Sequence, residues 1–173
     1  MKKLTFLKTM FLAVVLMVGS LSAFAQTTVT YSFSSSNEAG LNQAKPGIAV
    51  DENIGFASFK NSGTSNPVVL NGQLRLYQNA ETGGSIKIYA NNGVTITQVI
   101  VHASGGTGPA AYTVDGGTET KLDKNTIYTM SGLSATDVVE FYQKDAAKAN
   151  RIYVDKFEVT YTTSSSTEPT LTA

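Results

Sequence analysis

The stretch 72–104, GQLRLYQNAETGGSIKIYANNGVTITQVIVHAS, decides the fold expected for this chain. Apolar and polar residues alternate over 74–77 and again over 85–90, which is the period of a half-buried strand. The β-branched residues of 94–101 favour a third strand, and the glycines between the runs are too frequent for a helix. Asn92-Gly93 is a typical hairpin turn between alternating runs. The stretch therefore predicts three consecutive antiparallel strands.

The apolar residues of the third strand are unevenly spaced. Ile96 and Val99 are three positions apart and would face opposite sides of a regular strand. Either the strand begins near Gln98, or a β-bulge resets the alternation. The same spacing recurs near the end of the chain at Val154 and Phe157, which indicates two strands of similar structure.

The first 25 residues have the features of a signal peptide. A positive end is followed by the apolar run 10–18 and by Ala23-Phe24-Ala25, a small-x-small cleavage pattern. The alternative, an uncleaved anchor, would need roughly 20 apolar residues. We therefore predict export, with cleavage after Ala25 and no membrane insertion afterwards. The expected location is the periplasm, the cell surface or the extracellular space.

Cleavage there leaves one domain of a mildly acidic protein. The chain has 173 residues, so removing 25 leaves 148, which suits a single domain. Of 13 basic residues three lie in the leader, which leaves 10 against 13 acidic ones. This balance argues against nucleic acid as a partner. The absence of cysteine excludes disulfides, so an apolar core must supply the stability. We expect the domain over 26–162 and a disordered Ser/Thr-rich tail over 163–173.

Turn signals recur about every ten residues along this domain. Asp115-Gly116-Gly117-Thr118 predicts a second hairpin, the segment 144–150 can form one helical turn, and 151–162 is the longest expected strand. About 8–11 short strands with this spacing predict an all-β fold, specifically a jelly-roll-like antiparallel β-sandwich. In such a fold the two termini often lie close together.

These strand sequences resemble a known class of module. LRLY at 74–77, SIKIYA at 85–90, GVTITQVIV at 93–101 and RIYVDKFEVTY at 151–161 are similar to small β-sandwiches of secreted bacterial proteins, namely galactose-binding-like and carbohydrate-binding accessory domains. The resemblance extends over about 28–162. It implies a β-sandwich that binds sugars through aromatic and polar residues on loops, in some members with a structural calcium ion.

The residues offer little for catalysis. His102 is the only histidine, which excludes multi-histidine metal sites, and thiol nucleophiles are absent. We interpret His102 as a strand residue that faces solvent or is capped by a neighbour, not as a member of a catalytic triad. A small glycoside hydrolase would need two carboxylates facing each other across a cleft. We therefore predict that the protein is not an enzyme.

Binding has better candidates. A tyrosine offers an apolar face with a polar tip, and an arginine can form a bidentate contact with a ligand. The candidate ligand-binding residues are Arg75, Tyr77, Tyr112, Tyr142 and Arg151. Packing in the core or across strands is the competing interpretation for each tyrosine. No cofactor is expected and the metal site is unknown, although loop acids at Asp51, Glu52, Asp115, Asp123 and Asp137 could hold a structural calcium; the competing interpretation is solvated turn acids.

Two functions follow from this inventory. The leading hypothesis is a secreted, non-catalytic binding module with carbohydrate as the ligand class. The alternative is a structural or adhesive module that contacts a surface protein, for example by pairing an exposed strand edge. Glycan binding predicts that at least two tyrosines or an arginine converge on a concave, loop-lined patch, whereas adhesion predicts a flat apolar or edge-strand surface.

Overall fold

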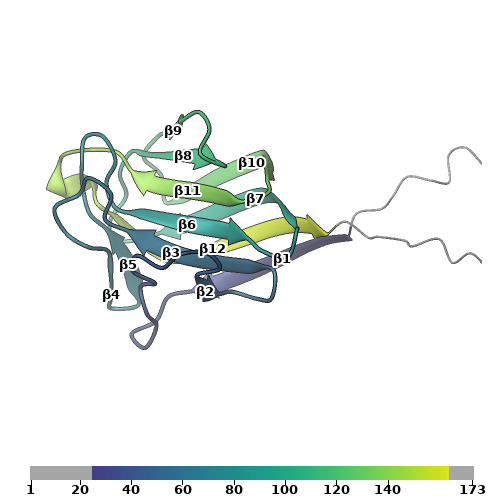
Figure 1. Cartoon of the computed structure of the whole chain (residues 1–173). Helices are drawn as coiled ribbons and strands as arrows, with labels where there is room; N and C mark the ends of the chain where they lie inside the picture. The colour runs from purple at the N-terminus through teal and green to yellow at the C-terminus, as the bar shows by residue number, and fades with distance from the viewer. Residues whose placement is uncertain (1–24, 164–173) are drawn as a thin grey trace, which may run out of the picture.

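The computed structural model describes residues 25–163 as two antiparallel β-sheets packed face to face (Figure 1). The first sheet has the order β10-β7-β12-β5-β4, with β1 also paired to β12, and the second has the order β2-β3-β6-β11-β8-β9. The strands of the first sheet are β1 (Ala25–Ser32), β4 (Val68–Leu70), β5 (Gln73–Leu76), β7 (Thr95–Ala103), β10 (Ile127–Ala135) and β12 (Ile152–Thr163). Those of the second are β2 (Ile48–Ala49), β3 (Ile54–Phe59), β6 (Ser85–Ala90), β8 (Ala110–Val114), β9 (Thr120–Leu122) and β11 (Val138–Gln143). The predicted all-β sandwich is confirmed.

Strand β12 is the centre of the first sheet. It pairs with β7 along one side, while β5 pairs with 152–154 and β1 with 156–163 along the other. Because Ala25 pairs with Thr163, the two ends of the described chain lie together at one end of the sandwich, as expected (Figure 1). The predicted signal peptide and tail otherwise lie outside the described residues.

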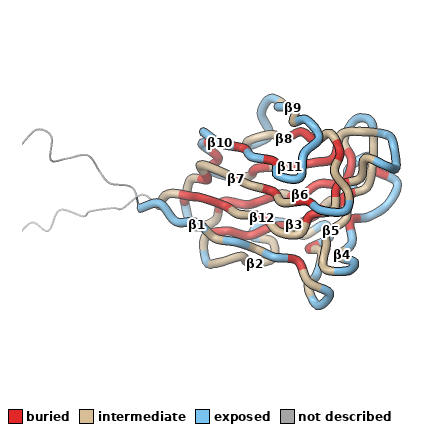
Figure 2. Tube along the Cα trace, turned by 180° about the vertical axis from the view of Figure 1, so that it is seen from behind, coloured by how far each residue is buried: buried red, intermediate tan, exposed pale blue. Residues whose placement is uncertain are grey.

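The core lies between the two sheets and is continuous (Figure 2). Ile86 and Phe141 from the second sheet and Leu76 and Val159 from the first are fully buried. An aromatic cluster lies near one edge and comprises Tyr31, Phe33, Phe56 and Phe157, with ring centroids 4.5–6.1 Å apart. Each buried large side chain contributes about 1.5–3 kcal/mol, so this core supplies the stability that disulfides would give a smaller secreted domain.

The predicted hairpins within 72–104 are wrong, although the three strands are present. Strand β5 lies in the first sheet, β6 in the second and β7 in the first again. Asn92 and Gly93 do form the expected turn, with φ of 51° and 73°, but this turn carries the chain from one sheet to the other. Each strand instead pairs with distant segments, because burying two sheet faces against each other outweighs local pairing.

Two other turns do close hairpins. Asn71 and Gly72, with φ of 54° and 73°, form the two-residue loop between β4 and β5, and Leu70 pairs with Gln73 across it. Positive φ at both positions matches the twist of paired strands. The predicted hairpin around 115–118 is confirmed, because β8 pairs with β9.

The uneven apolar spacing in β7 and β12 has one cause. The register between these paired strands shifts between Val154 and Lys156 and again between Thr160 and Tyr161. Ile96 and Val99 are both fully buried within one strand, so the bulge is the correct interpretation. The similarity between the two sequences marks two neighbouring, irregular strands.

The helical content is one 3-10 turn within residues 25–163. It spans Lys148–Asn150 and falls in the segment for which a helical turn was expected. The described residues include no helix of sufficient length and apolarity to cross a membrane.

Candidate ligand-binding face

Four side chains gather on the outer surface of the first sheet, at the end opposite the termini. Leu74, Leu76, Ile152 and Val154 point into the core, so the alternating residues Arg75 of β5 and Tyr153 of β12 point outward. Tyr153 pairs with Arg75 in register. Tyr77 and Arg151 flank this pair, one residue beyond Leu76 and one before Ile152. Strands β4 and β5 mark this end of the sandwich in Figure 1. We call Arg75, Tyr77, Arg151 and Tyr153 the arginine–tyrosine face.

Each arginine of this face stacks on a tyrosine ring. The guanidinium carbon of Arg75 lies 4.8 Å from the ring centroid of Tyr153, and that of Arg151 lies 4.8 Å from the ring centroid of Tyr77. Such cation–π contacts contribute about 0.5–1 kcal/mol each at exposed sites. They also restrain the long arginine side chains, which reduces the entropy lost when a ligand binds.

The polar atoms of the face are largely unused by the protein. Arg151 donates from Nε to Gln78 Oε1 at 2.7 Å, while Nε of Arg75 is shielded from solvent and has no hydrogen-bond partner in the described chain. Within residues 25–163, the hydroxyls of Tyr77 and Tyr153 make no hydrogen bond. By contrast, the hydroxyls of Tyr89, Tyr128, Tyr142 and Tyr161 are all engaged within the protein.

A buried amide fixes the loops that carry Tyr77 and Arg151. Gln143, fully buried at the end of β11, accepts from the backbone N–H of Asn79 at 2.9 Å. Its Nε2 donates to the carbonyl oxygens of Asp145 at 2.8 Å and Asn150 at 3.1 Å. One side chain thus ties the segment after Tyr77 to the segment before Arg151, and this holds the face together.

The loop after β7 supports Tyr153 from the other side. The Tyr153 N–H donates to the carbonyl of Gly106 at 2.9 Å. A Cβ added at Gly106 would lie 2.9 Å from the Tyr153 ring, so only glycine lets the backbone pass the ring this closely. Gln73 Nε2 completes the margin by donating to Ser104 Oγ and to Asp155 Oδ1, each at 2.9 Å.

Apolar side chains border the face on edge strand β4. Val68 pairs with Arg75 and is 40% exposed, and Leu70 pairs with Gln73 and is 46% exposed. Both therefore lie on the outer surface beside the arginine–tyrosine face. Rings, guanidinium groups and an apolar border together make an amphipathic surface of the kind that binds sugars or other partly polar ligands.

Of the five predicted binding residues, the structure brings together Arg75, Tyr77 and Arg151. Tyr112 pairs with the buried Phe141 and packs against the core, so its ring points inward. Tyr142 lies on the second sheet, where it is 4% exposed and donates to Glu119 Oε2 at 2.5 Å. Burial, reinforced by this negative partner, raises the pKa of the Tyr142 hydroxyl.

Tyr153 belongs to the face but is not among the five binding residues predicted from the sequence. The available signal was its spacing: Tyr153 is two residues from Arg151 on a strand and must share its face. The sequence does not show which residue lies beside Tyr153 on the neighbouring strand. Only the pairing of β12 with β5 places Tyr153 against Arg75.

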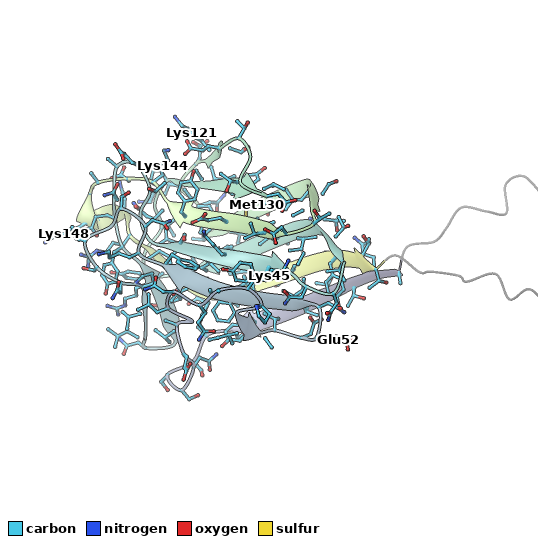
Figure 3. All side chains as sticks on the ribbon, viewed as in Figure 1. Lys45, Glu52, Lys121, Met130, Lys144 and Lys148 are labelled. Carbon is cyan, nitrogen blue, oxygen red and sulfur yellow. The ribbon has the colours of Figure 1, made fainter. Side chains whose placement is uncertain are left out.

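The outer surface of the second sheet is covered by the chain itself. Tyr89 is 7% exposed and donates to the carbonyl of Gln43, and Lys45 forms an ion pair with Asp137 at 2.8 Å. Figure 3 shows Lys45 in front of this sheet, and Lys121 and Lys144 beside β8 and β9. The rings of Tyr89 and Tyr142 are therefore less accessible than those of the arginine–tyrosine face, and Lys87 Nζ lies 4.7 Å from the ring centroid of the half-buried Phe59.

The predicted calcium ligands are mostly engaged in turns. Asp51 accepts from the N–H groups of Asn53 and Ile54 and from the Tyr161 hydroxyl. Asp115 accepts from three successive backbone N–H groups, 136–138. Partial burial acts to raise the pKa of Asp115, but these hydrogen bonds outweigh it and hold the pKa below its ordinary value. In residues 25–163 no three acidic or histidine side chains are grouped as metal ligands.

His102 is a half-buried strand residue on the outer surface of the first sheet, and its Nε2 makes no hydrogen bond in the described chain. Its Nε2 is 3.0 Å from Glu158 Oε1, and Lys156 donates to the same oxygen at 2.7 Å. The hydrogen bond from Lys156 outweighs partial burial and lowers the pKa of Glu158. This arrangement is a surface charge cluster.

A shallow depression of about 540 Å³ lies on the same sheet, nearer the termini. It crosses four neighbouring strands and is lined by Gln26, Thr28, Thr97, Gln98, Ser131, Gly132 and Thr160. Its lining has hydroxyl and amide groups but no aromatic ring. It can supply hydrogen bonds to a ligand but no stacking surface.

Comparison with known proteins supplies no family. No family model and no curated protein matches the sequence. Three solved structures are similar in fold. A low-affinity xylan-binding module, CBM86, from the gut symbiont Roseburia intestinalis is 16% identical over 61% of this chain and 93% of its own, with a TM-score of 0.42. A mutant of the family 29 carbohydrate-binding module CBM29-2 is 11% identical over 79% of this chain and 92% of its own, with a TM-score of 0.44.

The third structure is a family two carbohydrate esterase from Cellvibrio japonicus, 11% identical over 81% of this chain, with a TM-score of 0.41. This chain matches 36% of the esterase. Two of these neighbours are carbohydrate-binding modules, the class that the strand sequences resemble. At these identities and TM-scores the likeness assigns no ligand and no site residue. The described chain is an all-β sandwich module.

Proposed function

We propose that the protein is an exported, non-catalytic module that binds carbohydrate through the arginine–tyrosine face. The observation that carries this proposal is the convergence of two half-buried tyrosines, each with an unengaged hydroxyl, and two arginines on one outward surface. Sugar rings present apolar C–H faces and hydroxyl edges. Tyrosine rings and the apolar border of Val68 and Leu70 suit the C–H faces of a sugar, and guanidinium donors suit its hydroxyl edges.

The test is a retention screen of the purified protein on soluble and insoluble polysaccharides, with and without calcium. We expect saturable binding that weakens about tenfold in Tyr77→Ala and in Tyr153→Ala, because a central aromatic contact contributes about 1–2 kcal/mol. Tyr112→Ala is the matched control, since its ring points inward. Binding that is lost in Tyr112→Ala but kept in both other variants would contradict the assigned site.

Catalysis is tested on the same samples. Incubation with each retained polysaccharide should release neither reducing ends nor acyl groups over the period of the binding assay. Turnover that persists on further purification would show that the protein is an enzyme. The depression on the first sheet is tested with Gln98→Ala, which should reduce affinity by less than either tyrosine variant.

Adhesion through protein contacts is the second candidate, favoured by strand β10. Among the described strands it is a nine-residue edge strand, and Ile127 at its start is 47% exposed. Exposed edges can pair with another chain. This function predicts self-association or capture of a protein partner that is abolished by Ile127→Lys, with no retention on any polysaccharide.

A further inference from the structure

We propose that the arginine–tyrosine face recognises the carboxylate of an acidic sugar, so that the ligand is a uronate-containing polysaccharide. This inference rests on the proposed function, because it assigns a substrate class to the same face. It is carried by the charge arrangement around the two arginines.

Arg75 and Arg151 are the only arginines of the chain, and both lie on this face. The ion pairs of the described residues all use lysine or histidine: Lys45–Asp137, Lys87–Glu140, His102–Glu158, Lys144–Glu119 and Lys156–Glu158. Within residues 25–163 no carboxylate lies within ion-pair distance of either guanidinium group. In a chain with 13 basic and 13 acidic residues, the most strongly basic side chains are therefore left uncompensated.

The backbones of the two arginines lie close to each other. Arg75 pairs with Tyr153, and Arg151 is two residues from Tyr153, so the arginines are diagonal neighbours across strands, with backbones roughly 7–8 Å apart. Each guanidinium group carries a fixed positive charge, which an anion bound on this face would offset. Nε of Arg75 also has no acceptor within the described chain.

Other charged groups around the face do not neutralise it. Asp155 at the margin already accepts from Gln73 and Ser104. Lys148 is exposed at the same end of the sandwich, and Figure 3 shows it at the end opposite the termini. Asp145 contacts the backbone N–H of Ala147 at 2.6 Å. Neither Asp145 nor Asp155 lies within ion-pair distance of Arg75 or Arg151.

The chemistry of the pair selects a planar oxyanion on a sugar. A guanidinium group presents its donors as a rigid fork that matches a carboxylate, and the adjacent tyrosine rings offer a face for the sugar that carries it. A sulfate ester presents similar oxygens, so the two sources must be separated by experiment. An acidic peptide would satisfy the arginines but would not need the tyrosine rings.

The test compares four ligands by isothermal titration with the purified protein: polygalacturonate, its methyl ester, dextran sulfate and a neutral xylan. We expect the carboxylate form to bind at least tenfold more tightly than its methyl ester, with affinity falling as salt is raised. Arg75→Gln and Arg151→Gln should each weaken polygalacturonate binding about tenfold. Arg75→Lys should recover only part, because it keeps the charge and loses the fork. Lys121→Gln removes an exposed charge from β9 and is the matched control.

Each outcome separates this inference from the proposed function. Equal affinity for polygalacturonate and its methyl ester refutes recognition of the carboxylate. If binding of both depends on Tyr77, the proposed glycan site is still supported. This ligand comparison needs no variant and stands even if a substitution prevents folding. Preference for dextran sulfate assigns the arginines to sulfate instead, which also overturns it. Competition by polyglutamate that is insensitive to Tyr77→Ala would indicate an acidic peptide. Binding to none of the four polysaccharides refutes this inference, and the broader retention screen then decides the proposed function.

Discussion

Replacing Gln143 by Met tests whether one buried amide holds the arginine–tyrosine face together. Gln143→Met keeps nearly the same volume, so it removes hydrogen bonds without opening a large cavity. Three backbone groups lose a partner: the N–H of Asn79 and the carbonyls of Asp145 and Asn150. An unsatisfied buried polar group costs about 1–3 kcal/mol. Because both loops reach the surface and can recover some water, we expect a loss near the lower limit, about 3 kcal/mol in total.

The measurement is urea unfolding followed by tyrosine fluorescence or circular dichroism. With a slope of about 1.5–2 kcal/mol per molar urea for a domain of this size, the midpoint should fall by about 1.5–2 M. Gln26→Met, at an exposed position of β1, is the control and should change stability by less than about 0.5 kcal/mol. A change in Gln143→Met as small as that in Gln26→Met would refute the reasoning, because it would mean that the two loops do not depend on Gln143. Polysaccharide retention by folded Gln143→Met should also fall, since Tyr77 and Arg151 flank these loops.

Three further predictions concern a glycine pair, a turn carboxylate and an inward ring. Gly93 and Gly47 have φ of 73° and 74°, but a Cβ at Gly93 meets nothing within 4 Å, while one at Gly47 lies 2.4 Å from the Phe56 carbonyl oxygen. In urea unfolding, Gly93→Ala should lower the free energy of unfolding by about 1 kcal/mol and Gly47→Ala by at least twice that. Equal losses would contradict the packing argument. The pKa of Asp115 is lower in the folded state than its ordinary 3.8. The stability that the Asp115 carboxylate gives the fold is therefore complete above the unfolded-state pKa and is lost as pH falls through the folded-state pKa. Between pH 6 and 2 the melting temperature should fall less steeply in Asp115→Asn than in the unmodified protein, and parallel curves would argue against this assignment. Tyr112→Ala should lower the free energy of unfolding by about 2 kcal/mol, because its half-buried ring packs against the core, whereas an unchanged urea midpoint would show that the ring contributes no packing.

The sequence predicts individual strands well because alternation is a local property. The run 85–90 is a strand with the expected faces, and the bulge is one of the two interpretations that the uneven spacing at Ile96 and Val99 allowed. Asn-Gly pairs adopt their expected dihedral angles at both 71–72 and 92–93. These features depend on side-chain shape and φ preference within a few residues.

The sequence does not predict which strands pair with each other. The two Asn-Gly turns have nearly the same dihedral angles, yet one closes the β4–β5 hairpin and the other carries the chain between sheets. The difference arises from which sheet face each strand buries, and this depends on segments far along the chain. A local turn signal contains no information on that choice.

The candidate site shows the same division. The sequence alone determined an all-β module and identified Arg75, Tyr77 and Arg151 as residue types suited to binding. Only the tertiary structure paired β5 with β12, turned Tyr112 into the core, engaged Tyr142 with Glu119 and added Tyr153 to the face. The physical reason is that a strand pattern fixes which side of its own sheet a residue faces, whereas the neighbours across strands are set by long-range packing of two apolar sheet faces.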